Sequence, residues 1–127
     1  MFECKKILNG RGNVPEPEVH TVGGSEITAG MALTLNTSGL LVKATGAPTH
    51  IALADAAANT KVACYAVLPG MIFDVPVSAA PTSLKEGVKV TVAGTGLEVT
   101  ATTADGVATI VNLNGAKKAG DIIQVKF

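Results

Sequence analysis

Hydrophobic and polar residues alternate with a period of two in two separate stretches of the chain. Residues 31–35 read Met-Ala-Leu-Thr-Leu, and residues 88–92 read Val-Lys-Val-Thr-Val. This alternation places one set of side chains on a buried face and the other toward water, which predicts a β-strand in each stretch. A turn that closes at Gly39 or Gly96 follows, and a second apolar stretch begins directly after it. Each unit is therefore predicted to be a β-hairpin.

The two hairpins belong to an internal repeat. Residues 25–55 align with residues 82–112 without a gap, so that Gly30 meets Gly87. Self-similarity at one constant offset indicates a structural unit that is used twice. Chance similarity between two valine-rich hairpins is the alternative, because the composition of strands varies little. The repeat predicts that residues 31–44 superpose on residues 88–101, with the two glycines at equivalent turns.

The rest of the chain also favours strands. Five further strands are predicted, at residues 50–54, 62–68, 72–77, 107–113 and 122–127. No helix of the ten or more residues that connect parallel strands is visible, and this disfavours an α/β fold. Many short strands separated by Gly and Asn turns are typical of small β architectures. The expected fold is all-β, a small barrel or sandwich built from a duplicated β-hairpin unit.

The first eighteen residues differ from the remainder. They mix charges, an Asn-Gly turn signal and two prolines, and each proline removes a ladder hydrogen bond and favours extended backbone. The sequence therefore predicts an extended N-terminal arm at 1–18, with one short strand near residues 5–8, and a single β domain at 19–127. A frayed terminus is the alternative. The apolar residues Phe2, Ile7 and Leu8 argue against it, because a solvated tail has little use for them.

Composition narrows the classes of function. The 127 residues suit one domain, and the core must be aliphatic because the chain has no Trp, one Tyr and three Phe. Ten basic and ten acidic residues cancel, whereas a nucleic-acid binder needs a basic patch and, for single strands, stacking aromatic rings. No secretory signal and no apolar run of membrane-spanning length is present. We expect no nucleic-acid partner, no membrane partner and synthesis in the cytoplasm.

Residue types that carry chemistry are few. Four residues could bind zinc, but none has the spacing of a zinc motif, and each is interpreted as structural: Cys4, Cys64, His20 and His50. No Ser-His-Asp motif, paired carboxylates or phosphate-binding glycine loop is visible. The sequence therefore predicts a scaffold or binding module with free thiols, and neither an enzyme nor a protein with a metal or cofactor.

Three stretches carry a family resemblance. The opening MFECKKILNGRGNVPEPE, the central YAVLPGMIFDVPVSA and the later LEVTATTADGVATIVN resemble small capsid decoration (head-stabilisation) proteins of tailed bacteriophages of Gram-positive hosts. The resemblance implies a structural virion protein that binds the outer surface of the major capsid protein lattice and stabilises the phage head. Such proteins often sit at three-fold positions as homotrimers and place an N-terminal arm against the shell.

On this resemblance, the arm of the present chain carries the contacts to the capsid. The expected contact residues are three apolar anchors and three basic residues: Phe2, Ile7, Leu8, Lys5, Lys6 and Arg11. The expected location is the capsid exterior, reached after synthesis in the host cytoplasm. A head-fibre or host-surface glycan-binding module is the alternative function. The scarcity of aromatic rings disfavours it, because sugar faces usually pack on Trp or Tyr.

Overall fold

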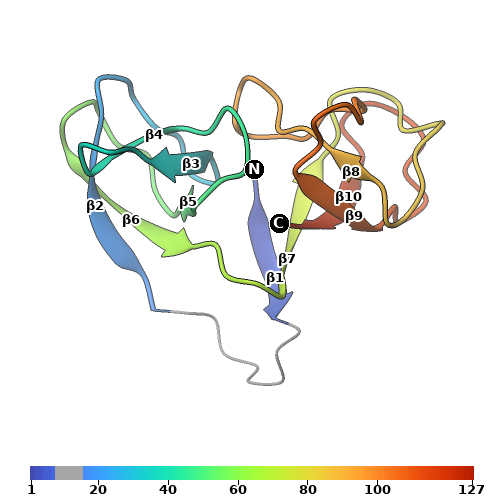
Figure 1. Cartoon of the computed structure of the whole chain (residues 1–127), viewed down its shortest axis with the longest axis horizontal. Coiled ribbons are helices and arrows are strands. Elements are labelled where there is room, and N and C mark those ends of the chain that lie inside the picture. Colours follow the sequence, from blue (N-terminus) through green and yellow to red (C-terminus); the bar gives the residue numbers. More distant parts are fainter. Residues whose placement is uncertain (8–15) are drawn as a thin grey trace.

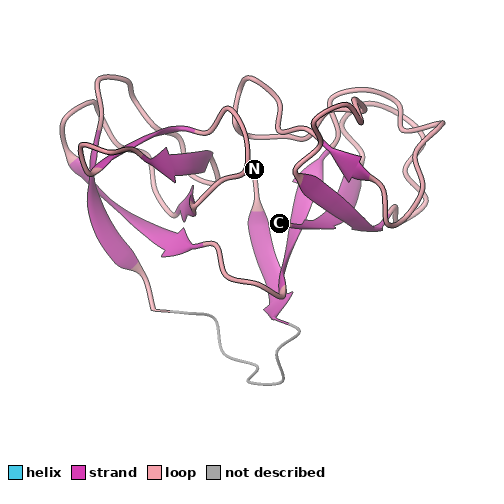
Figure 2. Ribbon diagram, viewed as in Figure 1, coloured by secondary structure: helices cyan, strands magenta, loops and turns pink. Residues whose placement is uncertain are grey.

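A computed structural model describes residues 1–7 and 16–127 (Figure 1). Every regular element of these residues is a strand, as Figure 2 shows, which confirms the all-β prediction. The described residues form no helix that could cross a membrane. The strands are β1 (Glu3–Ile7), β2 (Glu18–Val22), β3 (Ala32–Leu35), β4 (Leu40–Lys43), β5 (His50–Ala52), β6 (Lys61–Ala66), β7 (Met71–Pro76), β8 (Lys89–Val90), β9 (Ala108–Asn112) and β10 (Ile122–Lys126).

The first half of the chain closes into a five-stranded barrel. Its strand order is β2-β4-β3-β5-β6, and β6 returns to pair with β2. All of its pairings are antiparallel except that of β2 with β4. The interior is filled by apolar side chains without an aromatic ring, as the composition requires: Val22, Ile27, Met31, Leu33, Leu41, Ala52, Val62 and Cys64.

The second half of the chain and the N-terminal strand β1 together form a five-stranded sheet with the order β1-β7-β10-β9-β8. Figure 1 shows the barrel on the left of β1 and the other strands of this sheet on its right, with both chain ends near the middle. The larger hydrophobic core belongs mainly to this sheet and includes Phe73, Val75, Val90, Ile110 and Val125. Ala32, Ala44 and Ile51 of the barrel half also belong to that core, so the two halves share packed side chains.

The sheet repeats the strand pairings of the barrel. Its pairs β7–β10, β10–β9 and β9–β8 correspond to β2–β6, β6–β5 and β5–β3. Beyond β8, Val92 forms an antiparallel bridge with Val99, and Val99 forms a parallel bridge with Val77 just after β7. These two bridges correspond to β3–β4 and to the parallel pair β4–β2. The duplicated unit is therefore the whole closed ring of strand pairings, which we call the strand circuit. The predicted hairpin is one part of it.

The turns of the two hairpins are equivalent, as the repeat predicts. Gly30 and Gly87 both have positive φ, 76° and 86°, and so do Gly39 and Gly96, at 75° and 73°. The N–H of Gly39 donates to the carbonyl of Asn36 (3.0 Å), and the N–H of Gly96 donates to that of Ala93 (2.8 Å). Positive φ is the conformation that glycine adopts without a steric penalty. The two turns thus share their backbone conformation and the hydrogen bond that closes them.

The alignment is not ungapped beyond Gly96, which corrects the sequence prediction. Leu35 pairs with Leu41 in the barrel, whereas Val92 bridges Val99 in the sheet. The second turn is thus one residue longer, and Val99 is the equivalent of Leu41 and not of Val42. The extra residue matters because a slip of one position moves side chains to the opposite face of a sheet. In the later hairpin, the apolar stretch that follows Gly96 is predicted to be the returning strand, at residues 97–101, but of these residues only Val99 forms bridges.

The expectation of a separate N-terminal arm is wrong for residues 1–7. Strand β1 pairs with β7, with Cys4 opposite Phe73. Phe2 is only 3% exposed, and its ring packs edge-on against Phe73 (6.3 Å between centroids) and at a tilt of 46° against Phe127 (5.7 Å). The backbone N–H of Phe2 donates to the carbonyl of Gly30 (2.8 Å). Burial of a large ring in an aromatic-poor core makes this segment part of the fold.

Candidate functional site

The structure changes the role of the expected contact residues. Phe2 is buried, so its ring is not available to a partner. Lys5 is exposed, and its ammonium contacts Glu3 (2.9 Å) and Asp74 (3.9 Å). Lys6 and Ile7 belong to β1, but their side chains lie outside the described part of the structure, as do Leu8 and Arg11 entirely.

An exposed apolar surface surrounds the first residue. Met1, Leu53 and Ile122 are 56%, 38% and 45% exposed, and we call these three residues the N-terminal surface. Met1 and Leu53 line a cleft of about 240 Å³, and Met1 and Ile122 line a second one of about 250 Å³. Met1 therefore stands between two hollows that apolar side chains of a partner can enter.

Gly30 holds Met1 in place at this surface. A Cβ atom at Gly30 would lie 2.0 Å from Cγ of Met1, so only glycine permits this approach. The Met1 ammonium donates a hydrogen bond to the carbonyl of Leu97. Partial burial lowers the pKa of this ammonium, although the charge of Glu98 opposes the shift. The turn that the repeat singled out thus also positions the N-terminus.

Strand register gathers a second group of residues at the end of the barrel where β2 and β5 begin. Cys64 of β6 lies opposite Glu18 of β2 and opposite Ala52 of β5. His20 follows Glu18 by two residues, and His50 precedes Ala52 by two, so all of them project from the same face. That face is the barrel interior, because Cys64 is fully buried there. We call Glu18, His20, His50 and Cys64 the histidine–cysteine cluster.

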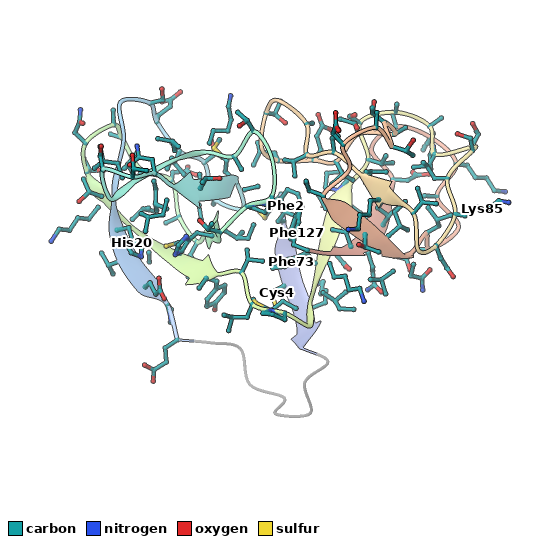
Figure 3. All side chains as sticks on the ribbon, viewed as in Figure 1. Phe2, Cys4, His20, Phe73, Lys85 and Phe127 are labelled. Carbon is teal, nitrogen blue, oxygen red and sulfur yellow. The ribbon has the colours of Figure 1, made fainter. Side chains whose placement is uncertain are left out.

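One carboxylate oxygen organises the cluster. Oε2 of Glu18 lies 2.9 Å from Nε2 of His20 and 3.0 Å from Nε2 of His50. The two imidazole rings meet edge to face, with 5.0 Å between their centroids. The thiol of Cys64 donates to the backbone carbonyl of Glu18 at 3.6 Å. Donor atoms of His20, His50 and Cys64 all lie within 4.8 Å of one another. Figure 3 shows His20 on β2, on the opposite side of the barrel half from the phenylalanine core.

Charge and burial differ across the cluster. Hydrogen bonds from His20 and then from His50 lower the pKa of Glu18, so the carboxylate is ionised at neutral pH. Burial raises the pKa of Cys64 to about 11, and the negative charge of Glu18 adds to this. Cys64 is therefore a protonated thiol at neutral pH. His50 is buried, whereas Glu18 reaches solvent, so the cluster can be approached from the rim of the barrel.

A further hydrogen bond fixes the ring of His50. Its Nδ1 lies 2.8 Å from the hydroxyl oxygen of Thr49, and that oxygen accepts the backbone N–H of Leu35 at 2.9 Å. With His50 neutral, Nε2–H donates to Glu18, and Nδ1 accepts the hydroxyl proton of Thr49. Both ring nitrogens are therefore held, and the side chain has one orientation.

Sequence spacing could not reveal this cluster. Its members lie on three strands, and only their pairing register brings them together. Zinc motifs that are recognisable in a sequence carry ligands close together, usually on one loop or hairpin. No protein-family model matches the chain, and neither does any curated protein. Function is therefore inferred from the residues and their geometry.

Proposed function

We propose that the protein is a structural virion protein that binds the outer surface of the major capsid protein lattice and stabilises the phage head. The observation that supports this most directly is the N-terminal surface. It exposes Met1, which belongs to the segment that the family resemblance places against the shell, together with Leu53 and Ile122, beside two clefts. Grouped apolar side chains at a protein surface mark a site of protein–protein interaction.

The N-terminal segment contributes in two ways under this proposal. Phe2 anchors the segment in the core of the decoration protein itself, and Met1 and the exposed Lys5 face the capsid. The contact is mainly apolar, because the chain has no net charge and Lys5 is already paired with Glu3. Homotrimers at three-fold positions, which the resemblance implies, would present three such surfaces to the lattice.

Stabilisation of the head follows from mass action. A protein that binds only the assembled lattice stabilises it by about 2.7 kcal/mol per site when its free concentration is a hundred times its dissociation constant. The effect adds over many sites, so modest affinity raises the resistance of the shell to heat and to the pressure of packaged DNA.

The test adds purified protein to undecorated heads and follows DNA release during heating, at low and at high salt. We expect release at a higher temperature, with protection preserved in high salt because apolar contacts are not screened. Leu53→Lys and Ile122→Lys should each weaken binding by about tenfold or more, since each buries a charge in an apolar contact. Val42→Lys is the matched control, because Val42 is 36% exposed, close to the value for Leu53, but lines a different cleft.

Three results would contradict the proposal. Unchanged DNA release in the presence of the protein would remove the stabilising role. Loss of protection in high salt would mean an electrostatic contact. Equal weakening by all three lysine variants would place the binding surface elsewhere than around Met1.

A further inference from the structure

We propose that the histidine–cysteine cluster binds one zinc ion at the end of the barrel. Its donors are two imidazoles, a thiol and a carboxylate, contributed by His20, His50, Cys64 and Glu18. Zinc prefers this combination of nitrogen, sulfur and oxygen ligands in four-coordinate tetrahedral sites. This inference is independent of capsid binding.

The distances require little movement for zinc to bind. Bonds of about 2.0–2.3 Å in a tetrahedral site place neighbouring ligand atoms roughly 3.3–3.8 Å apart. Donor atoms of His20, His50 and Cys64 already lie within 4.8 Å of one another. Nε2 of His20 and Nε2 of His50 also converge on the same oxygen of Glu18, at 2.9 and 3.0 Å. A small inward shift of side chains held on three paired strands completes the site.

Each of the four residues of the cluster has an equivalent in the second half of the chain, and those equivalents are not polar. Glu18 pairs with Cys64 in the barrel, and the equivalent pair in the second sheet is Phe73 with Val125. By the same register, His20 corresponds to Val75. His50 pairs with Leu33, just as Ala108 pairs with Val90. The four equivalents are all apolar and fully buried: Phe73, Val75, Ala108 and Val125.

Comparison of the two halves shows that the fold itself does not require polar residues at these positions. Apolar side chains are sufficient to fill this part of the strand circuit, since they fill it in the second half. Partly buried imidazoles and a carboxylate are a less favourable way to fill the same space unless they bind something. Both histidines of the chain and one of its two cysteines occupy this single cluster. Metal binding accounts for that concentration.

Protons and charges balance when zinc binds. Cys64 releases its thiol proton to solvent and binds as the thiolate, while the two imidazoles bind as neutral ligands. One thiolate and one carboxylate then cancel the two positive charges of the ion. His50 binds through Nε2 and carries its proton on Nδ1, which donates to the Thr49 hydroxyl 2.8 Å away. A hydrogen bond from the second ring nitrogen is the usual way in which a zinc-bound histidine is oriented.

The experiment uses the full chain, stripped of metal, with zinc chloride and cobalt chloride as probes. Native mass spectrometry and competition with a chromophoric chelator should give one zinc ion per chain. Cobalt should produce the visible bands of a tetrahedral ion and a near-ultraviolet thiolate band. Zinc should raise the melting temperature, because it binds the folded chain and joins β2, β5 and β6.

The variants take their residues from the second half of the chain, which makes them compatible with the fold. Cys64→Val copies Val125 and should remove the thiolate band and weaken zinc binding by about 100-fold or more. His20→Val copies Val75 and should weaken zinc binding while it keeps the thiolate band. Cys4→Val is the matched control, because Cys4 lies outside the cluster and its loss should change neither measurement.

Several results would overturn the proposal. They are less than one zinc per chain at micromolar concentrations, zinc binding of equal strength in all variants, or a thiolate band that disappears with Cys4 and survives without Cys64. Each can be read on the isolated protein, so failure here is separate from failure to bind phage heads.

Discussion

His50 and Ala108 occupy the same place in the two halves of the chain. Leu33 pairs with His50 between β3 and β5, and Val90 pairs with Ala108 between β8 and β9. Both residues are buried, yet one presents an imidazole and the other a methyl group. The strand circuit itself therefore does not require a polar residue here. The zinc site proposed above would explain why the barrel has polar residues at this place.

The first prediction concerns the metal-free protein. Cys64→Val should change its free energy of unfolding by less than about 1.5 kcal/mol, because valine fills the equivalent position in the second half. Urea unfolding in the presence of a chelator measures this change. A loss of several kcal/mol without metal would show that Cys64 is needed for packing.

The second prediction concerns the N-terminal strand. Phe2→Ala should lower the free energy of unfolding by about 3–5 kcal/mol, because it empties the space between Phe73 and Phe127. Urea unfolding measures the loss. Lys5→Ala in the same strand is the control and should cost no more than about 1 kcal/mol, since its ion pair with Glu3 is exposed. Near-native stability of Phe2→Ala would restore the arm as a separate element.

The sequence predicted those features that depend on local pattern. Period-two alternation marked β3 and β8, and the glycines at 30, 39, 87 and 96 marked their turns, because each signal lies within a few residues. The pairing of β1 with β7 joins residues far apart in the chain, and no local pattern encodes it. The extra residue before Val99 could not be recognised from the sequence either, because the valine and threonine residues around it align equally well with and without a shift of one residue.

The candidate metal site was missed for a related reason. Its residues alternate correctly on their strands, but their convergence depends on which strands are neighbours. The repeat held one usable signal, because His50 is the only residue of the cluster inside the aligned residues 25–55, and its equivalent in the second copy is the apolar Ala108. The ungapped alignment places His50 opposite Val107, one residue away from that equivalent.

The third prediction compares two equivalent glycines. Gly87→Ala should cost about 1–2 kcal/mol, because only the positive φ opposes the new side chain and no atom lies within 4 Å of it. Gly30→Ala should cost more, because its Cβ would also collide with Met1. Urea unfolding measures both costs. Gly30→Ala should in addition weaken binding to phage heads, and Gly87→Ala should not. Equal effects of the two variants would argue against the role given to Met1.

The fourth prediction is a pH dependence. Backbone N–H groups of Lys117 and then Lys118 donate to Asp121 and lower the pKa of its carboxyl below its usual range. A lowered pKa in the folded state means that the carboxylate stabilises the fold above the unfolded pKa, and that this is lost as pH falls through the folded pKa. Asp121→Asn should therefore lower the melting temperature at pH 7, and the difference from the native chain should shrink below pH 4.

Thermal melts between pH 2.5 and pH 7 test this dependence. Glu86→Gln is the control, because it removes an exposed carboxylate from the same half of the chain and should shift the melting temperature little at any pH. A constant difference between Asp121→Asn and the native chain at every pH would mean that the side chain acts through its shape and not its charge.

The position of β1 has a consequence for folding during synthesis. Strand β1 emerges from the ribosome before the barrel, but its partner β7 begins only at Met71, after the barrel is complete. The packing of the Phe2 ring is delayed further, because it can contact Phe127 only after Phe127 has been synthesised. At about 5–20 residues per second, this delay is roughly 6–25 seconds. The nascent chain therefore closes one barrel while β1 stays unpaired and the apolar ring of Phe2 stays unpacked in front of it, and chaperones can bind the segment during that interval.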